Sequence, residues 1–196
     1  MAAAPDIDAL AEEIAKALSV HGMRQRRWHA GSVLFYEADD PNGIHSNTHP
    51  SAIVDGGQTW TSAEAIYQAS RHEDERIRQR IRVADDALEA KRISREAIPH
   101  IPAEVRARWP QRKVVAMARA NLLRASQDAA FRAALLASGT REIVELAPSD
   151  DFWGAVERPS GRIFGTNVVG RIQITIRELV AKDLLAFHVP QAEEEA

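Results

Sequence analysis

Apolar residues recur at helical spacing along much of the chain. Between Asp6 and Leu18 they repeat every three or four positions, which predicts an amphipathic helix. Pro102 opens a longer predicted helix, which Pro110 would kink or divide because proline lacks an amide donor. The same spacing predicts further helices over 63–71, 85–91, 128–137 and 167–185. Within the last of these, 172–176 alternates equally well as a strand.

Short strands are predicted between the helical stretches. Residues 33–36 fit a strand, and Asp55-Gly56-Gly57 between 52–54 and 58–60 predicts a tight hairpin. Residues 142–146 fit a strand or a helical turn. Turn-forming residues predict irregular loops over 37–50 and 147–164. Together these elements predict a helix-rich α+β fold in a single domain with a small antiparallel hairpin.

Length and composition predict an ordinary globular protein. The 196 residues suffice for one hydrophobic core, and 45% hydrophobic with 27% charged residues argue against disorder. No apolar run approaches the ~18 residues of a membrane-spanning helix, and the N-terminus does not resemble a signal peptide. The absence of cysteine excludes disulfides and thiolate metal sites. We therefore expect a soluble cytoplasmic protein with no membrane partner; its oligomeric state stays open.

The predicted organisation has three parts. Residues 1–30 form an N-terminal amphipathic helix and lead-in, and 31–186 form the folded domain. Residues 187–196 are expected to be an acidic, flexible tail.

The charges are unevenly distributed. The net charge of −3 argues against a protein that coats nucleic acid, but 21 of the 25 basic residues are arginine. Because the arginine fork suits phosphate, a phosphorylated ligand is one interpretation; a bias toward arginine codons explains the count equally well. The stretch 71–113 carries a local charge of +4, which leaves room for a polyanionic substrate.

Candidate chemistry lies where the chain enters predicted helices. No familiar nucleotide, metal or acyl-enzyme motif occurs, and His45 and His49 lie in a predicted loop, so we expect no metal and no cofactor.

Glu64, at the start of a predicted helix, has two interpretations. It completes a capping box with Thr61, or it is a carboxylate kept ionised by the positive end of a helix and able to stabilise developing positive charge.

Two further polar clusters each allow two interpretations. Asp150, shortly before Phe152 and Trp153, suits an Asx turn or an acid held against an apolar wall. Asn167 suits a helix cap, and the small residues around it suit backbone N–H groups offered to a phosphate. Four tryptophans near the clusters could stack on a flat base, namely Trp28, Trp60, Trp109 and Trp153.

Taken in order, these features resemble the NADAR family (NAD- and ADP-ribose-associated), also called YbiA-like. The resemblance covers about 33–179. It rests on Phe35-Tyr36, Ser46-Asn47, Asp55-Gly56, Trp60, Glu64, Tyr67-Gln68, Lys91-Arg92, Trp109, Lys113, Met117, Leu135-Leu136, Glu145, Asp150, Trp153-Gly154, Gly165, Asn167 and Gly170.

The chain also departs from the family pattern. Ala65 stands where histidine is usual, and Lys91 stands where glycine is usual. The family often has proline at the position of Thr61, so its glutamate does not depend on a capping box. This favours a catalytic role for Glu64.

The resemblance implies an N-glycosidase, a hydrolase of N-glycosyl bonds. Members remove ADP-ribose from guanine bases of nucleic acid, some as antitoxins to DNA-modifying ADP-ribosyltransferase toxins. Others are similar to enzymes that cleave phosphoribosylated intermediates of riboflavin biosynthesis. A third possibility is a non-catalytic module that binds ADP-ribose. Cleavage of a ribose C1–N bond passes through an oxocarbenium-like state, which needs a nearby anion and a proton for the leaving nitrogen.

On this resemblance we expect Glu64 to act as the anion or to activate water, with Asp150 as its catalytic partner. The substrate would be bound by walls of aromatic rings, by cations at the phosphate and by polar groups at the ribose. These expected binding residues are Ser46, Asn47, Trp60, Tyr67, Gln68, Arg92, Trp109, Lys113, Trp153, Gly154 and Asn167. Lys113 has a second possible role, as a covalent amine that attacks an opened ribose.

Overall fold

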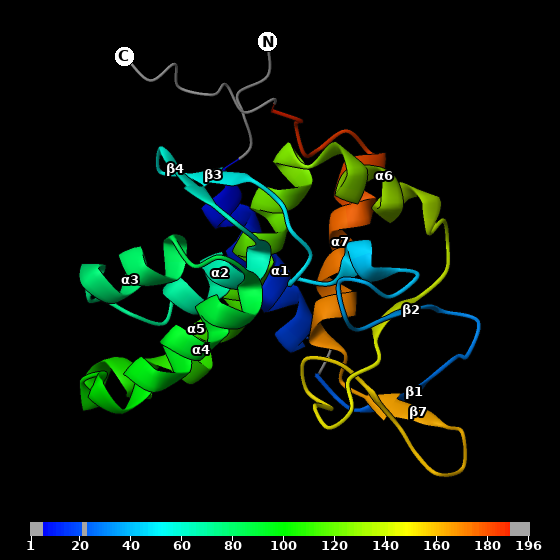
Figure 1. The fold of residues 1–196 in the computed structure, drawn as a ribbon. Helices are drawn as coiled ribbons and strands as arrows, with labels where there is room; N and C mark the ends of the chain where they lie inside the picture. Colours follow the sequence, from blue (N-terminus) through cyan, green and yellow to red (C-terminus); the bar gives the residue numbers. More distant parts are fainter. Residues whose placement is uncertain (1–5, 21–22, 189–196) are drawn as a thin grey trace.

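The computed structural model describes residues 6–20 and 23–188 (Figure 1). The α-helices are α1 (Ile7–Val20), α2 (Ala63–Ala69), α3 (Glu75–Arg82), α4 (Ala87–Ala97), α5 (Ala103–Gln127), α6 (Ala129–Ala137) and α7 (Val168–Ala181). The strands are β1 (Arg26–Trp28), β2 (Val33–Phe35), β3 (Ile53–Asp55), β4 (Gln58–Trp60), β5 (Ile143–Glu145), β6 (Val156–Glu157) and β7 (Ile163–Gly165). Two 3₁₀ turns, η1 (Gly43–His45) and η2 (Ile98–His100), complete the described elements.

The long helix α5 joins the two halves of the fold. Its C-terminal half is buried among α1, α6 and α7, and residues from Val114 to Ser126 supply much of the core. Its N-terminal half is mostly exposed and lies on the same side of the molecule as α2, α3 and α4 (Figure 1). Helix α2, buried along its whole length, packs against both α4 and α5. The polar side chains of α2 therefore face the interior between the two halves.

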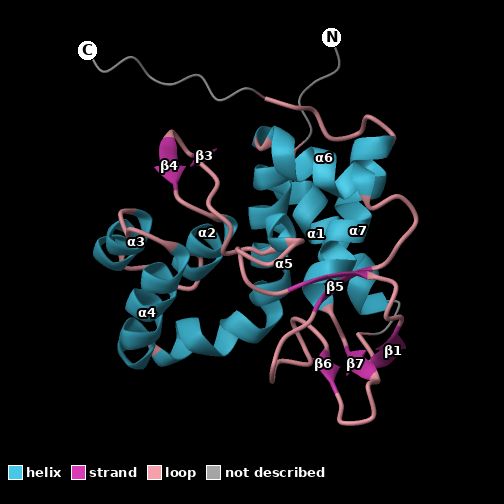
Figure 2. Ribbon diagram, turned by 45° about the vertical axis from the view of Figure 1, so that its right-hand side comes forward, coloured by secondary structure: helices cyan, strands magenta, loops and turns pink. Residues whose placement is uncertain are grey.

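The strands form three small separate sheets among the described residues (Figure 2). β2 and β5 run parallel with Phe35 opposite Glu145, and α7 packs against β5. β3 and β4 form the expected antiparallel hairpin, whose turn places Gly56 and Gly57 at φ values of 58° and 76°. These positive φ values suit a two-residue hairpin turn. β1, β7 and β6 form an antiparallel sheet.

The expected α+β class is confirmed, with differences in local detail. Residues 142–146 contain strand β5, and 167–185 contain helix α7 rather than a strand. Pro110 lies inside a continuous α5, at an exposed position where water can satisfy the carbonyl group that loses its helical partner. Helix α3 and strand β1 were not predicted, and the predicted loop 147–164 includes β6 and the start of β7.

Two sequence expectations concern the ends of the chain and the membrane. Residues 189–196, most of the predicted acidic tail, lie outside the described residues. Within the described part of the chain, no helix is both long enough and apolar enough to cross a bilayer.

Candidate active site

A cavity of about 360 Å³ lies where α2, α4 and α5 approach the ends of β2 and β5. Seven residues expected at the site line it: Ser46, Asn47, Glu64, Tyr67, Gln68, Asp150 and Trp153. The other charged residues in its wall are Glu37, Arg71, Lys91, Arg95 and Glu145. Its volume falls within the range typical of small-molecule sites.

Glu64 is a buried carboxylate that takes no part in capping its helix. Ser62, not Thr61, is the N-cap of α2, and its hydroxyl accepts a hydrogen bond from the Ala65 amide at 3.1 Å. Glu64 is 6% exposed, and its side chain instead accepts a hydrogen bond from Gln68 Nε2 at 2.7 Å. Lys91 Nζ lies 3.5 Å from the same carboxylate. The capping-box interpretation is therefore wrong, and the carboxylate is directed to the cavity.

Glu145, which we did not predict as a site residue, is a second carboxylate in the cavity wall. It ends β5, and its Oε2 is buried without a hydrogen-bond partner among the described residues. Burial, together with the negative charges of Glu64 and Asp150, raises the pKa of Glu145 to about 7. An acidic residue directly after the apolar pair Ile143-Val144 was the sequence signal for this position.

Asp150 forms the Asx turn that was one of its two interpretations. Its Oδ1 accepts hydrogen bonds from the backbone N–H groups of Phe152 and Trp153, at 3.0 and 2.8 Å. The side chain is exposed at the edge of the cavity rather than held against an apolar wall. One of its two oxygens is thus committed to holding the loop that carries Trp153.

Aromatic side chains form one wall of the cavity. The centre of the Tyr67 ring lies 5.5 Å from that of Trp153 in an edge-on arrangement and 5.6 Å from that of Trp109 in a tilted one. Burial raises the pKa of the Tyr67 hydroxyl to about 12, so this group stays protonated. Trp109 supports Tyr67 from behind and does not line the cavity.

Lys113 stacks behind the aromatic wall. Its ammonium group lies 3.6 Å from the centre of the Phe152 ring, and burial lowers its pKa. The side chain does not line the cavity. Lys113 thus makes a cation–π contact that holds Phe152 in place next to the aromatic wall, and it is not placed for the expected contact with phosphate.

The cations of the cavity differ from those we expected. Arg92 lies outside the cavity, where its exposed guanidinium pairs with Glu89 and Glu96. Lys91 and Arg95 line the cavity because residues four apart lie on the same side of α4, whereas Arg92 faces away. Arg71 also lines it and stacks over Trp109, 5.0 Å from the ring centre. The orientation of α4 thus places Lys91 and Arg95, and not Arg92, in the wall of the cavity.

Asn167 and Gly154 support the site without lining it. The fully buried Asn167 donates to the Ile143 carbonyl at 2.8 Å and accepts from the Glu145 amide at 3.1 Å, which fixes the end of β5. It has a positive φ of 51° and makes no side-chain cap. Gly154 passes so close to the strand that a Cβ atom there would lie 2.5 Å from the Glu145 carbonyl oxygen.

The first turn of α7 is not a phosphate site. The backbone N–H groups of 166–169 each donate to a carbonyl of 151–154, at distances of 2.6–3.1 Å. The small residues expected to offer these groups to a phosphate instead attach the Asp150–Trp153 loop to the helix. Trp60 likewise lies outside the main cavity, on β4 in the hydrophobic core.

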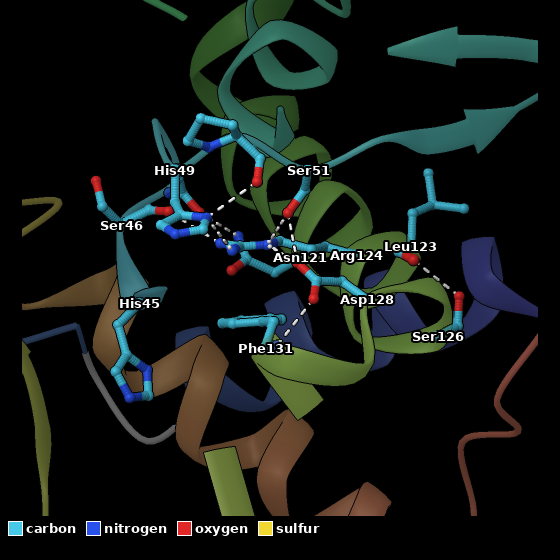
Figure 3. Close-up of polar contacts among 12 residues, drawn as sticks. His45, Ser46, His49, Ser51, Asn121, Leu123, Arg124, Ser126, Asp128 and Phe131 are labelled. Atoms are coloured by element: carbon cyan, nitrogen blue, oxygen red, sulfur yellow. Dashed lines mark hydrogen bonds and ion pairs between the residues drawn. The ribbon is translucent and has the colours of Figure 1, made fainter. Parts of the chain in front are cut away.

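A buried arginine anchors the segment that carries Ser46 and Asn47 (Figure 3). Arg124, 0% exposed, donates to the Ser46 carbonyl at 2.9 Å, to the Ser51 hydroxyl at 2.9 Å and to Asp128 at 3.1 Å. Asn47 is held separately, since its side-chain oxygen accepts from Asn121 at 3.0 Å. Its backbone carbonyl accepts from the Glu64 amide at 2.9 Å, which joins this segment to the start of α2.

The cavity therefore combines groups that suit a ribose phosphate. Glutamates from different elements line it, aromatic rings form one wall, and cations from α2 and α4 belong to the lining. Carboxylates can stabilise a developing oxocarbenium ion or transfer protons, and cations can hold a phosphate.

Comparison with known proteins places the chain in a family. The NADAR domain model matches residues 34–181. The chain is 31% identical over 149 residues to N-glycosidase YbiA of Escherichia coli (strain K12), covering 76% of this chain and 88% of YbiA. The solution structure of E. coli YbiA matches with a TM-score of 0.65 and 30% identity, over 82% of this chain and 90% of YbiA.

A riboflavin biosynthesis protein of Vibrio vulnificus (strain YJ016) is 33% identical over 146 residues, which cover 74% of this chain. The match spans only 38% of that longer relative. An N-glycosidase of Nostoc punctiforme is 29% identical, over 80% of this chain and 96% of the relative. These relatives support the enzyme class expected from the sequence, a hydrolase of N-glycosyl bonds. The chain belongs to the NADAR family.

Proposed function

We propose that this protein removes ADP-ribose from guanine bases of nucleic acid by hydrolysing the N-glycosidic bond. The observation that carries the proposal is the position of Glu64, a buried carboxylate in the wall of a cavity that also presents aromatic rings and cations. The YbiA relatives support N-glycosidase chemistry, and the substrate is our inference.

Glu64 acts on the ribose carbon. As the C1–N bond breaks, positive charge develops at C1 and the ring oxygen, and a carboxylate beside them stabilises it. The same carboxylate can accept a proton from the attacking water. Gln68, which donates to Glu64, fixes the carboxylate in this orientation.

The remaining wall residues hold the substrate. Tyr67 and Trp153 stack against the sugar or base, and Ser46, Asn47 and Asp150 bind ribose hydroxyls. Arg71, Lys91 and Arg95 bind the diphosphate. The Arg-rich helix α3 packs against α4 (Figure 2), and its arginines would attract a nucleic acid chain that extends from the cavity. A toxin with ADP-ribosyltransferase activity would be the natural source of such a substrate.

A second candidate substrate is a phosphoribosylated intermediate of riboflavin biosynthesis. The similarity to the riboflavin biosynthesis protein of Vibrio vulnificus favours it. The reaction breaks the same kind of ribose C1–N bond, and the same cations would hold a single phosphate. A module that binds ADP-ribose without turnover is the third candidate.

Direct assay distinguishes these functions. The protein is incubated with an oligonucleotide carrying ADP-ribosyl-guanine and, separately, with the phosphoribosylated riboflavin precursor. We expect release of ADP-ribose from the oligonucleotide, measured by chromatography. Release of ribose phosphate from the precursor alone would assign the second function. Binding of ADP-ribose with no release from either substrate would contradict both and leave the binding module.

Two neighbouring arginines test where the phosphate binds. Arg95→Ala is expected to raise KM about 10- to 100-fold with kcat nearly unchanged, because a charge-assisted hydrogen bond contributes about 1.5–3 kcal/mol to binding. Arg92→Ala on the same helix is the matched control and should leave KM unchanged, since Arg92 faces away from the cavity. Equal effects of the two substitutions would contradict this phosphate site.

A further inference from the structure

The backbone of Glu145 is fixed from several sides. Its N–H donates to Asn167 Oδ1 at 3.1 Å, and its carbonyl accepts from the Ala155 amide at 2.8 Å. It pairs with Phe35 in the parallel β2–β5 ladder. The side chain therefore starts from a defined point in the wall of the cavity, which Glu145 lines together with Glu64.

The two glutamates have different surroundings. Glu64 accepts a hydrogen bond from Gln68 and has Lys91 at 3.5 Å, so its negative charge is compensated. Glu145 Oε2 is buried with no hydrogen-bond partner among residues 6–20 and 23–188. An oxygen atom buried without a hydrogen-bond partner favours the neutral, protonated form of its carboxyl group.

The charges that face Glu145 come from four neighbouring elements. Glu64 on α2, Asp150 in the loop after β5 and Glu37 after β2 raise its pKa, whereas Lys91 on α4 lowers it. Burial is the largest cause, and the resulting pKa is about 7. Near neutral pH, Glu145 is thus able to hold a proton.

We propose that Glu145 is the general acid of the N-glycosidase reaction and donates its proton to the leaving nitrogen. The inference rests on the proposed function. The C1–N bond breaks with its electron pair passing to nitrogen, which takes the proton of Glu145. Water then forms the C1–O bond and gives a proton to Glu64. Exchange of protons with solvent returns Glu145 to its acid form and Glu64 to its carboxylate.

This assignment replaces Asp150 in the role of catalytic partner. Asp150 is exposed, and its Oδ1 is occupied by the amides of Phe152 and Trp153. Glu145 is the carboxyl group in the cavity wall with a buried, unpartnered oxygen. It therefore meets both requirements of a general acid, a proton near neutral pH and a free oxygen atom to deliver it.

Substrates with different leaving groups test the role. An amine leaving group needs a proton, whereas 4-nitrophenolate leaves readily without one. With the ADP-ribosyl-guanine oligonucleotide, Glu145→Gln is expected to lower kcat about 100- to 10,000-fold. With a 4-nitrophenyl riboside carrying the same diphosphate, the loss should be less than about tenfold. Glu64→Gln should impair both substrates, because both pass through the oxocarbenium-like state.

The pH profile gives a second readout. With the oligonucleotide, kcat/KM of the wild type should fall as pH rises above about 7, where Glu145 loses its proton. With the 4-nitrophenyl substrate this fall should be absent. An equal loss of activity on both substrates in Glu145→Gln, or the same alkaline fall for both in the wild type, would overturn the acid role.

Thermal stability tests the protonation of Glu145 without any substrate. In the native state the pKa of Glu145 is raised to about 7, whereas the ordinary pKa of a glutamate side chain is 4.5. Between these pH values the native state binds more protons than the unfolded chain, so this residue lowers stability as pH rises. Glu145→Gln removes this effect. The difference between the Tm of Glu145→Gln and the Tm of the wild type should therefore increase in favour of the variant as pH rises from 5 to 8.

Glu142→Gln is the matched control, because Glu142 lies just before the same strand and pairs with Arg26 at the surface. Its Tm should show no such gain. Parallel Tm curves for Glu145→Gln and the wild type would overturn the acid role even in an active enzyme. If the wild type turns over none of the substrates, the proposed function fails, and the acid role fails with it whatever the Tm curves show.

Discussion

Replacing Glu64 by glutamine is expected to abolish turnover while leaving the fold intact. The amide has nearly the same shape, and its oxygen can still accept the hydrogen bond from Gln68. It carries no negative charge, so it can neither stabilise an oxocarbenium-like state nor take a proton from water. We expect kcat to fall at least about 1,000-fold, since electrostatic and proton-transfer roles of this kind each contribute about 10²–10⁴.

The experiment pairs single-turnover kinetics with thermal unfolding. The Tm of Glu64→Gln should stay close to that of the wild type, because the N-cap of α2 is provided by Ser62 and not by Glu64. Glu96→Gln, an exposed substitution on α4, is the control and should change neither quantity. Retained turnover together with a large drop in Tm would return Glu64 to a structural role.

The larger elements of the fold were predictable because local rules decide them. The amphipathic spacing in 6–18 gave α1, and Asp55-Gly56-Gly57 gave the β3–β4 hairpin with its two positive φ values. The missed elements have little local signal. β6 has two residues and β1 has three, so pairing with β7 rather than sequence defines them. Helix α3 has only two isoleucines among polar residues and is held by α2 and α4.

The sequence was enough to predict many of the residues that lie at or near the site, but not the direction in which their side chains point. Thr61 and Ser62 are both good N-caps, and only the extended backbone of Ser62 decides which one caps α2. Arg92 and Lys91 are adjacent in sequence, yet helix phase sends one to solvent and the other to Glu64. Asn167 looked like a cap and instead holds β5, because the loop 151–154 already satisfies the first turn of α7.

Removal of Arg124 is expected to produce the largest loss of stability. Its guanidinium is fully buried, forms an ion pair with Asp128, and donates hydrogen bonds to the Ser51 hydroxyl and the Ser46 carbonyl (Figure 3). Burial alone would raise the pKa of Asp128, but hydrogen bonds from Ser51 and the Phe131 amide, with the charge of Arg124, hold it below its usual value. Arg124→Met would leave this carboxylate without its cation.

Breaking a buried ion pair by removing one partner costs about 3–5 kcal/mol, and we expect that loss in the free energy of unfolding of Arg124→Met. For a domain of this size it corresponds to a fall in Tm of about 6–20 °C. Arg92→Met, which breaks an exposed pair, is the control and should leave Tm almost unchanged. A change of similar size in both variants would contradict the anchoring role of Arg124.

The same substitution should weaken the site before the protein unfolds. Arg124 fixes the Ser46 carbonyl, and the next residue, Asn47, accepts the Glu64 amide through its own carbonyl. Without Arg124, this segment is less firmly held. The hydrogen bond between the Asn47 carbonyl and the Glu64 amide weakens, and Ser46 and Asn47 lose their fixed positions in the cavity wall. At a temperature well below its Tm, Arg124→Met is therefore expected to raise KM, because substrate binding must then also order Ser46 and Asn47, which costs conformational entropy. Restored Tm in Arg124→Met/Asp128→Asn without restored KM would separate the two roles, since removing the uncompensated charge does not rebuild the contact with Ser46.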